Sequence, residues 1–202
     1  KGKIIVTSGP TYEEIDDVKV VTNKSSGKQG RALAIELSAR GYEIIYIHSA
    51  SIDHIPGLDN VSFHSSNDLK NKILENINKT DAIFMTAAVS DFTVKKSSGK
   101  ISRSNGNITL EFIPNEDIIA TIKSSYPEIK CIAFSAQVDD ELNFNKINTK
   151  NVDYLVINNI LKNNFGSDAN KVSIIDHQHL IFESEELDKN EISRDILNAL
   201  EY

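Results

Sequence analysis

The chain has 202 residues, of which 40% are apolar and 25% charged, as expected of one ordinary globular domain. Its net charge of −7 argues against a dedicated nucleic-acid-binding protein, because such proteins are usually basic. No apolar run reaches membrane-spanning length and the N-terminus has no signal-peptide core, so we expect a cytoplasmic protein with neither a nucleic-acid nor a membrane partner. We therefore treat residues 1–202 as a single domain.

Short apolar segments rich in β-branched residues recur along the chain and predict strands. They are Lys3–Thr7, Glu43–His48, Val61–Ser65, Asp81–Val89, Ile108–Ile113, Lys130–Ser135 and Tyr154–Asn158. Segments with helical spacing or helix-start signals stand between most of them. They are the segment that begins at Arg31 and is ended by the C-cap signal Arg40-Gly41, and the segments Asp68–Ile77, Ile118–Lys123, Glu141–Lys150 and Asp188–Leu200.

This alternation predicts an α/β fold, a Rossmann-like and mostly parallel sheet with helices on both faces. Val172–Asp176 and Leu180–Glu183 flank a polar turn and predict a C-terminal β-hairpin. A ligand of such a sheet binds at the carboxyl ends of the strands, where the strand order reverses. The loops after the first and fourth strands and the polar loop Phe165–Lys171 are expected at that edge.

Two further connections are long and polar. Tyr12–Val21 carries several carboxylates and is interpreted as a long connection. Lys95–Asn107 has almost no apolar residue to bury and contains two glycines, so we expect it to be mobile.

The stretch Thr22–Leu37 leads from small polar residues straight into a helix. Ser25 or Ser26 is expected to cap the helix start, and Gly27 and Gly30 allow the backbone to approach a ligand closely. The positive end of a helix attracts phosphate, so this stretch is a candidate anion site. The alternative is a capped helix with solvated lysines.

This stretch differs from the common phosphate-binding motifs. A Walker A loop needs glycine where Thr22 stands, and a dinucleotide fingerprint needs glycine where Ser25 stands. Lys24 and Lys28 nevertheless add positive charge to an otherwise acidic chain.

Other polar residues are weaker candidates. Asp91 follows the fourth strand where a substrate-binding carboxylate would lie, or it caps a turn. Lys146 and Lys150 share one helix face and either reach phosphates or are surface charges. The polar tract and its surroundings supply further cations, which either contact a triphosphate or are solvated. These are Lys95, Lys96, Lys100, Arg103 and Lys123.

Several residues are interpreted as structural. None of the five histidines has a partner at metal-ligand spacing, and Cys131 lies inside a buried strand, which indicates an inert thiol. Tyr126 and Lys130 match the Tyr-x-x-x-Lys pattern of short-chain dehydrogenases, but Pro127 prevents the helix which that motif needs. The second strand also ends in His48 without the acidic residue that binds an NAD ribose.

Taken together, the motifs TSGPT, TNKSSGKQG, TAAVSDF, Lys100, PNEDI, IAFSAQ, VINN and FGSDANKV resemble, in this order, the phosphopantothenoylcysteine synthetase family. A member of that family is often the C-terminal half of the bifunctional Dfp/CoaBC flavoprotein. The resemblance covers nearly the whole chain, and no flavin-binding half precedes it here, so we expect a stand-alone form.

The resemblance implies a phosphopantothenate–cysteine ligase of coenzyme A biosynthesis. The family activates the carboxylate of 4′-phosphopantothenate with CTP as an acyl-cytidylate, and the amine of L-cysteine then forms the amide and releases CMP. It implies Mg²⁺, a homodimer and a separate phosphopantothenoylcysteine decarboxylase as a partner. The alternatives are an NAD(P)-dependent reductase on the same fold and a non-catalytic nucleotide-binding module.

The resemblance also assigns residues. Asn23 matches the asparagine that holds the acyl group, and Lys100 matches the lysine that acts on the triphosphate, so both are implied to be catalytic. The implied substrate-binding residues are Gly9, Lys19, Ser25, Ser26, Gly27, Ala87 and Ala88. The implied nucleotide-binding residues are Met85, Thr86, Ala87, Asp91, Lys100, Glu116, Asp117, Ile118, Ile119, Phe134, Lys146 and Lys150.

The chain departs from the family pattern at three places. The Lys-x-Lys-Lys of the polar loop keeps only its first lysine, at Lys100, and Glu116 replaces the proline of Asn-Pro-Asp-Ile. Gln137 replaces a glutamate, which removes a carboxylate. These differences affect the details of nucleotide contacts more than the implied activity.

Overall fold

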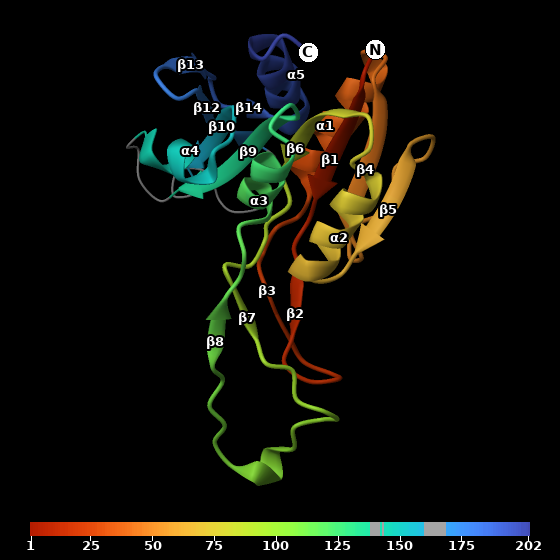
Figure 1. Cartoon of the computed structure of the whole chain (residues 1–202), viewed down its shortest axis with the longest axis vertical. Helices are drawn as coiled ribbons and strands as arrows, with labels where there is room; N and C mark the ends of the chain where they lie inside the picture. Colours follow the sequence, from red (N-terminus) through yellow and green to blue (C-terminus); the bar gives the residue numbers. More distant parts are fainter. Residues whose placement is uncertain (138–141, 143, 160–168) are drawn as a thin grey trace.

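The computed structural model describes residues 1–137, 142, 144–159 and 169–202, and an eight-stranded sheet forms its centre (Figure 1). The strand order across the sheet is β13-β12-β10-β9-β6-β1-β4-β5. The six parallel strands are β1 (Lys3–Ser8), β4 (Glu43–Ser49), β5 (Asp59–Phe63), β6 (Thr80–Met85), β9 (Lys130–Gln137) and β10 (Tyr154–Asn159). The antiparallel hairpin β12 (Val172–Ile175) and β13 (Leu180–Glu183) completes one edge. The predicted α/β fold with a C-terminal hairpin is confirmed.

The strand order reverses at β1, which pairs with β4 on one side and with β6 on the other. The parallel strands thus follow the 3-2-1-4-5-6 order of doubly wound dinucleotide-binding sheets. A crevice is therefore expected above the carboxyl ends of β1 and β6, next to Ser8 and Met85.

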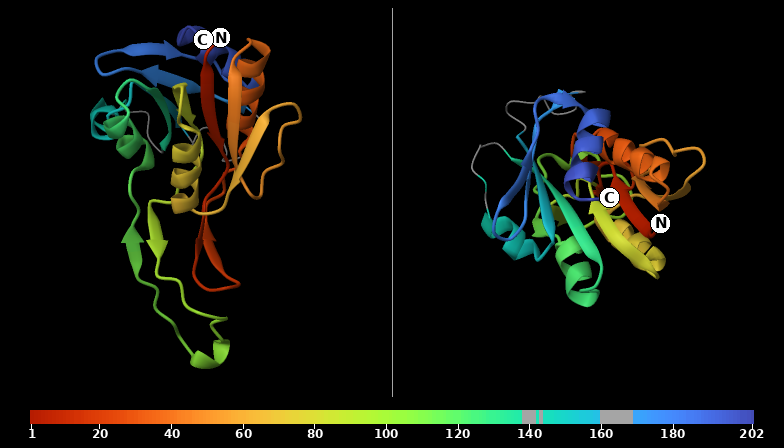
Figure 2. Two further views of the ribbon diagram at one scale, coloured as in Figure 1. Left: turned by 45° about the vertical axis from the view of Figure 1, so that its right-hand side comes forward. Right: turned by 90° about the horizontal axis from the view of Figure 1, so that it is seen from above.

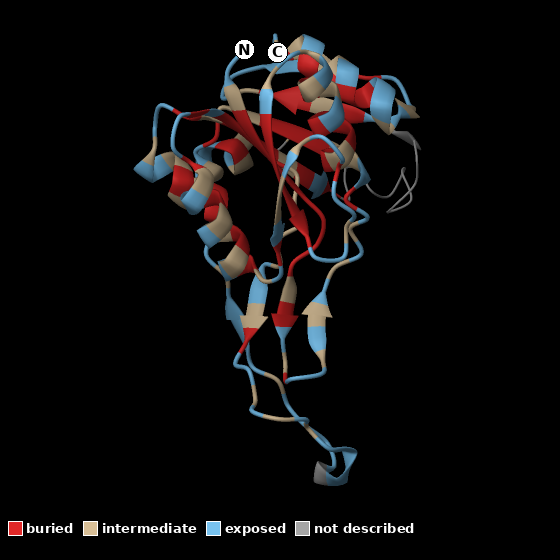
Figure 3. Cartoon of the chain, turned by 90° about the vertical axis from the view of Figure 1, so that its right-hand side faces the viewer, coloured by how far each residue is buried: buried red, intermediate tan, exposed pale blue. Residues whose placement is uncertain are grey.

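In the described part of the chain, five α-helices cover both faces of the sheet (Figure 2). They are α1 (Lys28–Ala39), α2 (Ser66–Asn76), α3 (Ile118–Ser125), α4 (Phe144–Lys150) and α5 (Lys189–Ala199). Alternate residues of β1 point to opposite faces, as the pleat requires. Ile4 and Val6 join a core with α1 and α5, whereas Ile5 joins a core with α2, α3 and α4. Figure 3 shows these buried strands at the centre of the body.

Two β-hairpin segments project from this body as an arm (Figures 1 and 3). One is β2 (Tyr12–Glu14) with β3 (Val20–Thr22), and the other is β7 (Phe92–Val94) with β8 (Phe112–Pro114). The predicted long connection Tyr12–Val21 forms the first of these hairpins, because its two ends pair with each other as antiparallel strands.

Two predicted strands are shorter than expected. Asp81–Val89 stays in the sheet only to Met85, because the following backbone turns to the loop after β1, where the Ala88 N–H donates to the Gly9 carbonyl at 2.9 Å. Of Ile108–Ile113, only Phe112 and Ile113 pair, because the partner strand β7 ends at Val94.

The C-terminal part adds a two-stranded sheet from β11 (Ala169–Asn170) and β14 (Leu187–Asp188). Residues 165–168 of the predicted loop Phe165–Lys171 lie outside the described residues, as does the start of the predicted helix Glu141–Lys150. No helix in the described parts of the chain has the length and apolarity needed to cross a membrane.

Candidate functional site

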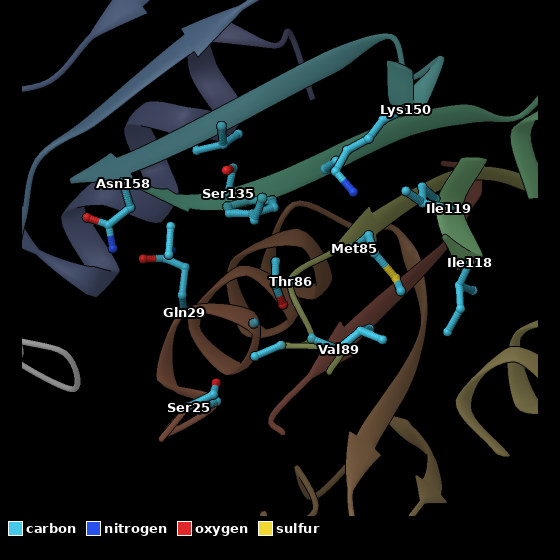
Figure 4. A pocket seen from close by; sticks show the side chains of 18 of the residues that line it. Ser25, Gln29, Met85, Thr86, Val89, Ile118, Ile119, Ser135, Lys150 and Asn158 are labelled. Carbon is cyan, nitrogen blue, oxygen red and sulfur yellow. Dashed lines mark hydrogen bonds between the residues drawn. The ribbon is translucent and has the colours of Figure 1, made fainter. Parts of the chain in front are cut away.

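A cavity of about 600 Å³ lies at the predicted edge of the sheet, above β1, β6 and β9 (Figure 4). Its walls are the start of α1, the segment 85–91 after β6, the segment 115–119 before and within α3, the end of β9 and one face of α4. This volume is typical of small-molecule sites.

The start of α1 forms one wall and has no side-chain cap. Gly27 occupies the N-cap position with φ of 69°, and its N–H donates to the Ser25 hydroxyl at 3.4 Å. The expectation that Ser25 or Ser26 caps the helix was wrong, because the left-handed turn at Gly27 places the helix start beyond both serines. The backbone N–H groups at an uncapped helix start can donate hydrogen bonds to an anion bound in the cavity.

Gly30 allows α1 to approach the strand ends closely. A Cβ at this position would overlap the Thr86 hydroxyl and lie 2.8 Å from the Ser8 Cβ. The Ser8 hydroxyl in turn donates to the Gly27 carbonyl at 2.7 Å. The helix start is therefore held directly on the carboxyl ends of β1 and β6.

The segment after β6 is held by Thr7 at the end of β1. The Thr86 hydroxyl donates to the Thr7 carbonyl, and the Ala87 N–H donates to the Thr7 hydroxyl at 3.0 Å. These bonds fix the backbone of the segment that the resemblance assigns to both substrates.

Asn23 does not line the cavity itself, but it joins two segments that do. Its side-chain amide donates to the Ala88 carbonyl at 2.6 Å, and its side-chain carbonyl accepts from the Ser25 N–H at 3.1 Å. The loop before α1 and the segment after β6 are thus bridged by a single half-buried side chain.

Two lysines of α4 face the cavity, each with a polar partner. The Lys146 ammonium donates to the Ser135 hydroxyl at 2.6 Å, and the Lys150 ammonium pairs with Asp117 at 2.6 Å. Asp117 also caps α3 by accepting from the Ala120 N–H at 3.2 Å.

Glu116 lies at the same rim and is already paired. Lys70 contacts its carboxylate at 2.5 Å and lowers its pKa, and the Thr121 hydroxyl donates to it at 2.6 Å. Glu116 is therefore ionised at neutral pH and engaged with α2 and α3.

Fifteen of the assigned residues line the cavity together. They are Ser25, Ser26, Gly27, Met85, Thr86, Ala87, Ala88, Asp91, Glu116, Asp117, Ile118, Ile119, Phe134, Lys146 and Lys150. Besides Asn23, the structure places three assigned residues away from it. Gly9 does not line the cavity, and its carbonyl accepts from the Ala88 N–H. Lys19 lies in the arm, where its ammonium pairs with the Asp16 carboxylate. Lys100 is exposed in the arm.

The sequence did not single out several cavity residues. Gln29, Ser135 and Asn158 contribute polar side chains to its lining (Figure 4), and Asn115 and Lys189 also line it. Ser135 and Asn158 stand at the carboxyl ends of parallel strands, a signal from which they could have been found. Lys189 starts a helix that is far away in the sequence, so only the fold reveals its position.

Cys131, Tyr126 and Lys130 lie away from the cavity. Cys131 is fully buried, and burial raises the pKa of its thiol to about 12. Among the described residues, no group of three or more His, Cys, Asp or Glu side chains could hold a metal ion. Tyr126 ends α3 and Lys130 begins β9, so these two residues do not share a helix face.

The sequence of the chain is similar to a known protein family and to several known proteins. The whole chain, residues 1–202, matches the family described as the DNA/pantothenate metabolism flavoprotein C-terminal domain. The coenzyme A biosynthesis bifunctional protein CoaBC of Bacillus subtilis (strain 168) is 34% identical over 178 residues, which are 85% of this chain and 44% of that protein. A cysteine/cysteine sulfinic acid decarboxylase of an unknown prokaryotic organism is 30% identical over 210 residues, which are 98% of this chain and 57% of that protein.

A solved structure is also similar over nearly its full length. The crystal structure of the C-terminal domain of a coenzyme A biosynthesis bifunctional protein CoaBC superposes with a TM-score of 0.78 at 27% identity, covering 99% of this chain and 96% of that chain. The chain spans about half the length of the curated relatives it matches.

Proposed function

The chain belongs to the family of DNA/pantothenate metabolism flavoprotein C-terminal domains, and on that basis we propose that it is a phosphopantothenate–cysteine ligase of coenzyme A biosynthesis. The observation that carries the proposal is the cavity at the point where the strand order reverses. It combines an uncapped helix start, two lysines and the segment 85–91 in one place. Relatives named for coenzyme A biosynthesis support this activity.

In the first step the carboxylate of 4′-phosphopantothenate attacks the α-phosphorus of CTP. An acyl-cytidylate forms and pyrophosphate leaves. Both reactants are anions, so the site must offset their repulsion. The α1 start, Lys146 and Lys150 supply positive potential at the cavity.

In the second step the amine of L-cysteine attacks the acyl carbon. The amide bond forms, the bond to the cytidylate breaks, and CMP leaves as the amine loses a proton. Asn23 joins the two segments beside this position and would hold the acyl group with its neutral amide. No side-chain nucleophile is required, because the activated intermediate is the mixed anhydride itself.

Mg²⁺ is part of the proposal and fits the cavity as an ion carried by the nucleotide. Magnesium usually binds through one or two carboxylates together with substrate phosphates and water. Asp91, whose exposed carboxylate lines the cavity, is the residue that would contact it. The ion would neutralise charge on the phosphates.

A homodimer is also proposed, and the arm supports it. Six of the ten large apolar side chains that are exposed in the described parts of the chain lie on the arm, namely Val18, Val20, Phe92, Ile108, Phe112 and Ile113. Exposed apolar side chains concentrated in one part of a molecule are typical of an association surface. A monomer with full activity in sedimentation and kinetic experiments would contradict the dimer.

The test is pyrophosphate release with 4′-phosphopantothenate and L-cysteine, measured with CTP, ATP, GTP and UTP in turn. We expect release that depends on phosphopantothenate and is fastest with CTP. NAD(P)H oxidation is measured in parallel with carbonyl substrates. Reductase turnover without pyrophosphate release would favour the reductase, and nucleotide binding without either reaction would favour the non-catalytic module.

A further inference from the structure

Both neighbours of Lys100 are bound to the turn of the β2–β3 hairpin. The Gly99 N–H donates to the Asp17 carboxylate at 3.0 Å, and the Gly99 carbonyl accepts from the Asp17 N–H at 3.2 Å. The Ile101 N–H donates to Oδ2 of Asp16 at 2.9 Å. The hairpin turn therefore sets the backbone on each side of Lys100, although more than 80 residues separate the two segments.

Asp16 is the centre of this attachment. Its side chain is fully buried, and Oδ1 accepts from the N–H groups of Val18 and Lys19 at 2.8 and 2.7 Å. Oδ2 accepts from Ile101 and from the Lys19 ammonium. The Lys19 ammonium and these backbone donors hold the pKa of the Asp16 carboxyl well below its usual range.

The two oxygens have separate partners, apart from Lys19, which contacts both. Oδ1 closes the hairpin turn, as aspartate side chains commonly do. Oδ2 reaches across to the loop that carries Lys100. Lys100 itself is exposed and makes no ion pair with any residue in the described part of the chain.

We propose that Asp16 is a positioning residue that holds the backbone at Lys100 in place through its Oδ2. The proposal rests on the proposed function, in which Lys100 acts on the triphosphate. Because Lys100 lies in the arm and away from the cavity of its own chain, it would reach the cavity of the partner protomer in the proposed homodimer. A lysine side chain has several freely rotating bonds, so a fixed backbone is what limits where its ammonium can reach. Small displacements of a reacting group are known to reduce rates about 100-fold.

The variant Asp16→Asn tests the roles of the two carboxylate oxygens separately. An asparagine whose side-chain oxygen takes the place of Oδ1 keeps both turn bonds. Its NH₂ group then takes the place of Oδ2, where it cannot accept from the Ile101 N–H or from the Lys19 ammonium, because all three groups are donors. The reverse orientation would lose both turn bonds. The substitution therefore loosens the loop side while it leaves the turn intact.

A matched control lies at the far edge of the sheet. Asp176 accepts from the N–H groups of Gln178 and His179 at 2.7 Å each, which is the same kind of turn bond without any link to Lys100. Asp176→Asn is therefore expected to behave as wild type in every measurement below.

Three measurements test the proposal on the full chain. Hydrogen exchange of the peptide that spans residues 97–102 should become at least about tenfold faster in Asp16→Asn than in Asp176→Asn. Single-turnover pyrophosphate release with 4′-phosphopantothenate and CTP should fall roughly 10- to 100-fold. In a Lys100→Gln background the same substitution should cause no further loss.

These measurements distinguish failure of the positioning role from failure of the proposed function. A release rate within about twofold of wild type, or an equal loss in the Lys100→Gln background, would overturn the positioning role and leave the proposed function standing. A wild-type chain without any CTP-dependent release would overturn both. If Asp16→Asn does not fold, Ile101→Pro decides instead, because it removes the N–H that Oδ2 accepts while Asp16 and its turn bonds stay in place. Unchanged release in that variant would overturn the proposal.

Discussion

The Asn23 side-chain amide donates to the Ala88 carbonyl at 2.6 Å and so connects the loop before α1 with the segment after β6. In Asn23→Asp a carboxylate would face that carbonyl and lose the donor. We expect the first half-reaction to continue and amide formation to become at least roughly 100-fold slower, in the range found when a single stabilising donor is removed. Rapid-quench kinetics that quantify pyrophosphate and amide separately would measure this.

Asn115→Asp is the control for this variant. Asn115 also donates to a carbonyl of the same segment, that of Ser90, at 2.9 Å. If both variants change the ratio of the two half-reaction rates equally, the effect arises from a shift of the segment 85–91 and not from a specific role of Asn23. Amide formation at the wild-type rate in Asn23→Asp would show that Asn23 does not hold the acyl group.

Gly30→Ala tests the close approach of α1 to the strand ends. Alanine is a better helix former than glycine by about 1 kcal/mol. The new Cβ would nevertheless overlap the Thr86 hydroxyl, so we expect a net loss of about 1–3 kcal/mol in the free energy of unfolding. Urea unfolding gives the value, and a double-mutant cycle with Thr86→Ala should recover part of the loss. An unchanged or increased stability would contradict this packing.

Cys131 predicts a pH dependence of stability. Burial raises the pKa of its thiol from 9.0 to about 12, so the folded chain holds the proton more tightly than the unfolded chain. The resulting stability is complete below about pH 9 and is lost as the pH rises toward 12. At pH 10.5 the loss should be about 2 kcal/mol relative to Cys131→Ala. Equal pH profiles of unfolding in the two proteins would contradict the shift.

The layout of the sheet could be predicted because each buried strand is a compact apolar run and helical segments separate them. The position of the cavity followed from the same pattern, since carboxyl ends of parallel strands share one edge. Asp91, which the strand pattern placed at this edge, lines the cavity together with Asp117 and Phe134, which were assigned by the resemblance alone.

Apart from the strand at Phe112 and Ile113, the arm could not be predicted from the sequence, and the reason is physical. Its strands are three residues long, too short to show a period, and its exposed residues carry no core pattern. The polar tract 95–107 was expected to lack anchors because few apolar residues can be buried there. Its anchors are instead the carboxylates of Asp16 and Asp17, which bind backbone N–H groups, and any residue except proline supplies those.

Lys100→Gln is the strongest single test of the proposed chemistry. Its ammonium is exposed and unpaired among the described residues, so its removal should leave the thermal midpoint within about 1 °C of wild type, as surface substitutions usually do. A lysine that stabilises charge on the α-phosphate and on the leaving pyrophosphate is worth about 3–4 kcal/mol, or a hundred- to thousandfold in rate. Single-turnover pyrophosphate release should fall by that factor. Lys95→Gln is the matched control, because Lys95 is also exposed in the arm and is expected to cause only a mild loss. Equal losses in the two variants would indicate a diffuse electrostatic effect of the arm, and full activity in Lys100→Gln would show that this lysine has no part in the reaction.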